Sequence, residues 1–138
     1  MATLRSLQMT NPRYPVSGPG MGGRSVKVER GTYLGAGQIG DTIELFKLHP
    51  RFRVTGGFVK TDGMGTSVTI TVGDSGDPAR YFASASVATA GVNTAVAASG
   101  LDYRTSAYTT VFATIAGAAL NGTGTLTVVL TGTIEEPA

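Results

Sequence analysis

The sequence predicts an all-β fold, an antiparallel β-sandwich or jelly-roll-like single domain that carries an extended N-terminal arm. In several runs polar and apolar residues alternate with a period of two, as in a strand with one buried face. The 138 residues include 20 glycines, spaced like turns and bulges and without a collagen-like period. Threonine and valine are abundant, and their branched Cβ atoms favour extended backbone. A chain of this length suits one domain, which we place at residues 24–138.

The first 23 residues do not resemble part of a core. Pro12, Pro15 and Pro19 lie among several glycines, and this composition blocks both helices and strand ladders. The segment is nevertheless too apolar for a solvated linker. We expect residues 1–23 to form an extended arm that lies on its own domain or on an adjacent subunit, the alternative being a tail that is partly disordered in isolation.

The first half of the domain predicts a strand from Arg24, a loop over Gly35–Gly40 and then three strands over Asp41–Val72. We interpret these three as an antiparallel meander, with Asp62-Gly63 as a hairpin turn, because both central residues of a type I′ turn need positive φ. Gly56-Gly57 interrupts one strand, which favours a bulge or a bend where the chain changes sheets.

The second half predicts further strands and one short helical turn. Asp77 followed by Pro78 resembles an N-cap and first helical position, so we expect a helical turn over Pro78–Phe82. Residues 83–100 fit either an irregular strand pair or a long excursion. Strand character resumes at Leu101–Arg104, and Asn121-Gly122 predicts a second hairpin. Three rows should face the core: Val68, Ile70 and Val72; Val111, Ala113 and Ile115; Leu126, Val128 and Leu130.

Composition excludes several classes of function. There is no cysteine, which rules out disulfides, thiolate metal sites and cysteine nucleophiles. No run approaches the ~20 apolar residues of a membrane span, and the N-terminus lacks the apolar core of a signal peptide. We therefore expect a soluble protein made in the cytoplasm, with no membrane partner.

Charge is divided unevenly along the chain. Residues 1–60 hold nine Lys/Arg and three Asp/Glu (9 − 3 = +6), whereas residues 61–138 hold two and six (2 − 6 = −4), which gives the net charge of +2. Such a chain can meet a copy of itself, or an acidic surface, with opposite charges opposed. The alternative is that folding interleaves the two halves. The pair Arg51/Arg53 has no aromatic interleaving suited to stacking bases, so we expect no nucleic-acid partner.

Two sequence motifs suggest chemistry that their context does not support. Gly35–Gly40 matches G-x-G-x-x-G, but no helix or second parallel β unit follows, as dinucleotide binding requires. Residues 73–78, G-D-S-G-D-P, differ by one residue from the motif around the nucleophile of trypsin-like proteases. Their possible partners, His49 and Asp62, fall with Ser75 within one small domain, whereas those enzymes spread the triad over two barrels. We expect no enzyme activity and no cofactor.

Metal binding is also weakly indicated. Asp74 and Asp77, with Asp62, could contribute oxygens to a Ca²⁺ site, but their spacing fits no known ligand loop, and aspartate is common in glycine-rich turns. His49 is the only histidine, which makes a poor zinc site. We expect no metal.

Several runs resemble small head-associated structural proteins of tailed bacteriophages, in particular the decoration or cement class. The runs are G-D-T-I-E-L-F-K-L-H-P-R-F-R-V-T-G-G, G-T-S-V-T-I-T-V-G-D-S-G-D-P-A-R-Y-F, L-D-Y-R-T and V-F-A-T-I-A-G-A-A-L-N-G-T-G-T-L-T-V-V-L, within residues 24–131. The resemblance implies a β-sandwich subunit, often a homotrimer, that binds the major capsid protein on the outer surface of the virion and bridges capsomers. It carries no catalytic residue across.

On this hypothesis the interface lies in and beside the arm, at Leu4, Arg5, Leu7, Arg13, Tyr14, Met21 and Arg24. One alternative is a carbohydrate-binding β-sandwich from a spike or fibre, which would need exposed aromatic rings among Tyr81, Phe82, Tyr103 and Tyr108. The other is a tail or connector component.

Overall fold

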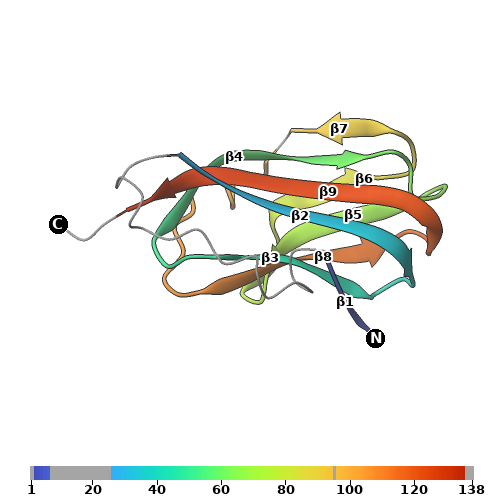
Figure 1. Cartoon of the computed structure of the whole chain (residues 1–138), viewed down its shortest axis with the longest axis horizontal. Coiled ribbons are helices and arrows are strands. Elements are labelled where there is room, and N and C mark those ends of the chain that lie inside the picture. Colours follow the sequence, from blue (N-terminus) through green and yellow to red (C-terminus); the bar gives the residue numbers. More distant parts are fainter. Residues whose placement is uncertain (1, 7–25, 95, 136–138) are drawn as a thin grey trace.

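Two β-sheets packed face to face make up the protein (Figure 1). The computed structural model describes residues 2–6, 26–94 and 96–135. These residues form nine strands: β1 (Thr3–Arg5), β2 (Val26–Gly37), β3 (Thr42–Leu48), β4 (Phe52–Thr61), β5 (Thr69–Asp74), β6 (Asp77–Ser86), β7 (Gly91–Asn93), β8 (Thr109–Ala116) and β9 (Leu120–Ile134). One sheet has the order β1-β3-β8-β5-β6 and the other β2-β9-β4-β7. The predicted all-β sandwich is confirmed.

The pairing is antiparallel except at one edge, where β1 runs parallel to β3. Within the described ranges no helical segment has the length and hydrophobicity of a membrane span.

The three inward rows expected from the period of two are confirmed. All nine side chains are at most 1% exposed, and they lie in one core cluster between the sheets. Burying a valine, leucine or isoleucine side chain contributes about 1.5–3 kcal/mol, so these rows are a large part of what holds the sheets together.

The meander expected over Asp41–Val72 is wrong, because its strands alternate between the two sheets. β3 and β5 belong to the five-stranded sheet and β4 to the four-stranded one, so the chain crosses the sandwich after β3 and again after β4. Asp62-Gly63 closes no hairpin; Asp62 instead accepts a hydrogen bond from the Thr125 N–H in β9 (2.6 Å). Alternation identifies the buried face of a strand but not its neighbour, so it does not distinguish a hairpin from a crossing.

The helical turn expected over Pro78–Phe82 is also wrong, since these residues belong to β6. This strand forms an edge of its sheet, where a proline is tolerated because its missing N–H leaves no ladder bond unmade. Register shifts on either side of Val72 interrupt the pairing with β5. Bulges of this kind break the alternation of faces, and Tyr81 and Phe82 are accordingly both buried although they are consecutive.

Asn121-Gly122 makes a bulge inside β9 and not the expected hairpin. The Asn121 side-chain oxygen accepts the N–H groups of Thr123 (2.9 Å) and Gly124 (3.0 Å), and Gly122 has φ 83°. The register with β2 shifts at the same place. The local turn chemistry was recognised correctly, but a strand can absorb such a turn as a bulge without reversing.

Gly56-Gly57 does form the expected bulge, with a register shift between Val54 and Gly56, but the strand stays paired with β9 on both sides and does not change sheets. A Cβ at Gly57 would lie 2.4 Å from the Val129 carbonyl oxygen, so only glycine fits.

The part left open, residues 83–100, contains the end of β6 and the short strand β7. Leu101–Arg104 is not a strand as expected. It contains a turn with Asp102 at φ 67°, and only Arg104 bridges to β4, at Arg53.

Candidate functional site

Two predicted interface residues, Leu4 and Arg5, lie in β1 at the edge of the five-stranded sheet. Leu4 is partly buried and packs against the core. Arg5 Nε lies 3.0 Å from Glu44 Oε1 of β3. The remaining five predicted residues, Leu7, Arg13, Tyr14, Met21 and Arg24, lie outside the described residues. The interface role of all seven therefore stays a prediction.

Hydrogen bonds from β3 and the residue before it fix the first residues of the chain. Asp41 accepts the N–H groups of Gln38 and Ala2, each at 3.0 Å, and these bonds, that of Gln38 first, hold the pKa of its carboxyl below the usual range. Ser6 donates its hydroxyl to the Leu45 carbonyl oxygen. Residues 2–6 thus complete a sheet of their own domain, a role that a generic arm would not have.

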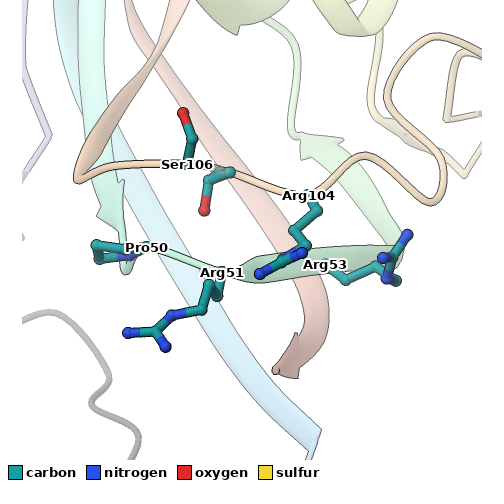
Figure 2. A pocket seen from close by; sticks show the side chains of 6 residues that line it. Pro50, Arg51, Arg53, Arg104 and Ser106 are labelled. Carbon is teal, nitrogen blue, oxygen red and sulfur yellow. The ribbon is translucent and has the colours of Figure 1, made fainter. Parts of the chain in front are cut away.

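An arginine-lined depression lies at the end of the sandwich where β3 turns into β4 (Figure 2). Its volume is about 650 Å³, and it is wide open to solvent. We call it the arginine depression; its lining residues are Pro50, Arg51, Arg53, Arg104, Thr105 and Ser106. In the view of Figure 2 the Arg104 guanidinium lies between those of Arg51 and Arg53.

Two of these arginines are neutralised locally. Glu135 binds Arg53 with both carboxylate oxygens, at 2.8 and 3.0 Å, and these bonds raise the pKa of Arg53 above its usual value. Asp102 adds a second contact to Arg53 at 3.2 Å. Arg104 Nε lies 3.3 Å from Glu135. Folding therefore interleaves opposite charges from the two halves of the chain at this end.

Arg51 differs from its neighbours, because its backbone is fixed while its side chain makes no ion pair or hydrogen bond within the described part of the chain. The Phe52 N–H donates to the His49 carbonyl oxygen (3.2 Å), which closes a four-residue turn with Pro50 second and Arg51 third. Arg51 has φ 66°. Its N–H donates to Thr105 O (2.8 Å), and its carbonyl accepts the Glu135 N–H (2.9 Å).

An exposed tyrosine extends this end of the molecule. Tyr108 is 64% exposed, and its ring meets that of His49 edge to face, with 5.3 Å between centroids. Sequence reasoning weighed Arg51 and Arg53 only as nucleic-acid ligands and did not identify the arginine depression. The sequence feature that could have pointed to this site is the arginine at the third position of a turn that begins His-Pro.

The G-D-S-G-D-P segment forms a tightly bonded turn between β5 and β6. Asp74, 3% exposed, accepts the N–H groups of Gly76 and Asp77 and binds Arg80 Nε at 2.9 Å. The Arg80 guanidinium lies 3.9 Å from the centre of the Tyr103 ring. These contacts stabilise the turn and connect it to Tyr103.

The possible triad of His49, Asp62 and Ser75 is not assembled. His49 precedes β4 and Asp62 follows it, and a ten-residue strand is about 30 Å long. Ser75 lies in the β5–β6 turn, at the end of β5 remote from Asp62. The geometry that acyl transfer requires is therefore missing for these residues.

The other tempting motifs are ordinary strand and turn chemistry. Gly35–Gly37 continue β2 and a turn leads into β3, so no helix N-terminus faces a phosphate site there. Asp74 is bonded within its turn, and Asp62 lies at the opposite end of the sandwich. Within the described residues no three His, Cys, Asp or Glu side chains group around a possible metal position.

The aromatic rings required by the carbohydrate alternative are not exposed together. Tyr81 and Phe82 are buried, Tyr103 is partly buried and only Tyr108 is open to solvent. A platform for stacking sugars is therefore not formed by these four residues.

Three solved structures with a similar fold are phage capsids, whereas no protein-family model matches the sequence and no significant match is found among curated proteins. A chain of the cyanophage Pam1 capsid asymmetric unit is 25% identical with a TM-score of 0.65, over 90% of this chain and 96% of that one. A chain of the capsid of Ralstonia phage GP4 is 20% identical with a TM-score of 0.76, over 99% of both. A chain of the acidic stable capsid of Helicobacter pylori bacteriophage KHP30 is 15% identical with a TM-score of 0.51, over 78% of this chain and 93% of that one. The resemblance to capsid-associated phage proteins is thereby confirmed at the level of the fold.

Proposed function

We propose that this protein is a non-enzymatic structural component of a phage virion that decorates the outer surface of the head and stabilises it by bridging capsomers. The observation that carries the proposal is the shared fold over 99% of both chains with the Ralstonia phage capsid chain, together with 25% identity to the cyanophage capsid chain. The two matches cover 90% and 99% of this chain, so the likeness extends over nearly all of it.

The proposed partners are the major capsid protein and further copies of this chain, as a homotrimer. In a decoration protein many weak contacts act together, so that the summed affinity exceeds that of any single subunit. Because residues 2–6 complete the subunit's own sheet, the contacts to capsid should come from the segment that follows Ser6, which contains Leu7, Tyr14 and Met21.

The test is binding to purified cognate capsids that lack this protein. A variant with Leu7, Tyr14 and Met21 replaced by serine keeps β1, unlike a deletion of the whole arm, which would uncover the edge of β3. We expect the wild type to co-sediment with capsids and to raise the temperature at which they disrupt, and the triple variant to lose both effects. Val92→Ser is the matched control, because it removes an exposed apolar side chain from the edge strand β7.

Two results would contradict the proposal. Failure of the wild-type protein to bind capsids would argue against decoration, and full occupancy by the triple variant would argue against the arm. Sedimentation of the free protein gives its mass and tests the proposed homotrimer separately. A monomeric mass would contradict the homotrimer but not the capsid binding.

A further inference from the structure

We infer that the arginine depression is a docking site for an acidic segment of a protein partner, with Arg51 as the residue that binds its carboxylate. The inference concerns a surface other than the arm. It rests on the proposed function in one respect, which is that the acidic segment belongs to the capsid surface. Three observations carry it: the backbone of Arg51, the charges around it and the form of the depression.

Arg51 occupies a backbone position that favours another residue. A turn with proline second and positive φ at the third residue prefers glycine or asparagine there, since a Cβ in the left-handed region is crowded. Hydrogen bonds to Thr105 and Glu135 hold this conformation whatever the side chain. Within the described residues the arginine side chain makes no ion pair or hydrogen bond that would offset this backbone cost, and such strain is typical of functional positions.

Among the residues that the structure describes, the charges around the depression leave one guanidinium without an acidic partner. Arg53 and Arg104 share Glu135, and Arg53 also contacts Asp102, so the three arginines and two acids give 3 − 2 = +1. Arg51 makes none of these contacts. A free guanidinium matches a carboxylate with two parallel hydrogen bonds, so it favours an acidic side chain as its partner.

The form of the depression favours a protein segment over a nucleic acid. It is open and about 650 Å³ in volume, enough for a few side chains. A nucleic acid would need a row of free cations or stacked rings. In the described part of the chain this depression has one arginine without an ion pair, and one tyrosine, Tyr108, is exposed nearby. Arginine and tyrosine are the residues that most often dominate protein interfaces.

The molecule supplies a matched control for the strain at Arg51. Ser67 is the third residue of a turn closed by the Val68 N–H and Gly65 O (3.2 Å), with φ 67°, at the opposite end of the sandwich. Arg51→Gly and Ser67→Gly therefore make the same backbone change, but only the first removes a charge from the depression.

The first experiment uses hexaglutamate peptide as the probe and amide NMR shifts as the readout. We expect the peptide to shift residues around the turn and Thr105, with binding about tenfold weaker in Arg51→Gly and unchanged in Ser67→Gly. Binding should weaken with added salt. Equal binding by Arg51→Gly, or shifts located elsewhere, would overturn the inference, as would tighter binding of a single-stranded oligonucleotide than of the peptide.

The second experiment measures occupancy of cognate capsids by the same variants and separates the two proposals. If the wild type binds capsids and Arg51→Gly binds equally well, the inference is wrong and the decoration role stands. If Arg51→Gly loses peptide and capsid binding together while Ser67→Gly keeps both, the inference holds. If no variant binds capsids but the peptide result is as expected, the decoration role fails and the acidic-segment site remains.

Discussion

Arg80 and Arg51 lie at the same end of the sandwich, but they differ in the contacts that their side chains make. The Arg80 side chain is 17% exposed, paired with a 4% exposed Asp74 and stacked on Tyr103. Arg51 has a fixed backbone in a strained conformation and no such partner within the described residues. An arginine that stabilises a fold is recognised by the acidic and aromatic side chains that contact its guanidinium. An arginine that binds a partner is recognised by the absence of such contacts in its own subunit.

The pKa of Arg80 reflects this saturation. Burial by itself would lower the pKa, but the hydrogen bond and charge of Asp74 outweigh burial and raise the pKa above its usual value. Asp74 and Arg80 therefore depend on each other, because either residue alone would be a largely buried charge without an opposite charge beside it.

Breaking this pair should have the largest effect. Arg80→Ala leaves the Asp74 carboxylate buried with only its turn amides and Tyr81 as partners, and we expect a loss of about 3 kcal/mol in the free energy of unfolding. Urea denaturation measures it. Asp74→Asn combined with Arg80→Met should recover part of the loss, and a single-variant loss below about 1 kcal/mol would mean that the pair is not structural.

Tyr81, which completes the Arg80 cluster, should limit stability at high pH. Burial first, and the Asp74 charge second, raise its pKa above the usual 10.0. The unfolded chain thus loses this proton first, so the contribution to stability is complete below pH 10 and is lost as pH rises toward the folded pKa. One such group changes stability by at most about 1.4 kcal/mol per pH unit.

Tyr81→Phe should therefore flatten the decline of the urea midpoint between pH 10 and 11.5. A residual slope is expected from Tyr33, whose pKa burial and then Asp41 also raise. Tyr33→Phe is the control for that part. An identical decline in wild type and Tyr81→Phe would show that Tyr81 ionises freely in the folded protein.

The smallest expected change in the free energy of unfolding is that of Arg51→Gly, and it is a gain, unlike the loss in Arg80→Ala. Arg51→Gly relieves roughly 1–2 kcal/mol of left-handed strain but adds about 0.5–1 kcal/mol of backbone entropy to the unfolded chain. We expect a net gain in the free energy of unfolding of about 0.5 kcal/mol, measured beside Ser67→Gly, which should behave alike. A clear loss of stability in Arg51→Gly alone would mean that the side chain supports the fold, and the contrast with Arg80 would disappear.

Much of the fold could be predicted from the sequence, but the surroundings of the two arginines could be predicted only in part. Val68, Ile70 and Val72 alternate with polar residues, and the structure buries all three. Asp74, the charged partner of Arg80, lies close by in the sequence in the G-D-S-G-D-P turn, although we expected a helical turn there. The His-Pro turn that contains Arg51 is a local feature, but the hydrogen bonds that hold its backbone come from Thr105 and Glu135, which are distant in the chain and follow from no local pattern.

The sequence by itself determined that the chain is all-β and which side chains turn inward, because the two-residue period of a strand is a local property. Only the tertiary structure decided which sheet each strand joined. Asp62-Gly63 lies in a crossing between sheets and Asn121-Gly122 in a bulge, although both were expected to form hairpins. The same residues suit a hairpin, a crossing and a bulge, and packing between distant strands decides among them. The arginine depression is likewise a product of that packing, which brings two separate segments, residues 50–53 and 104–106, together at one end of the sandwich.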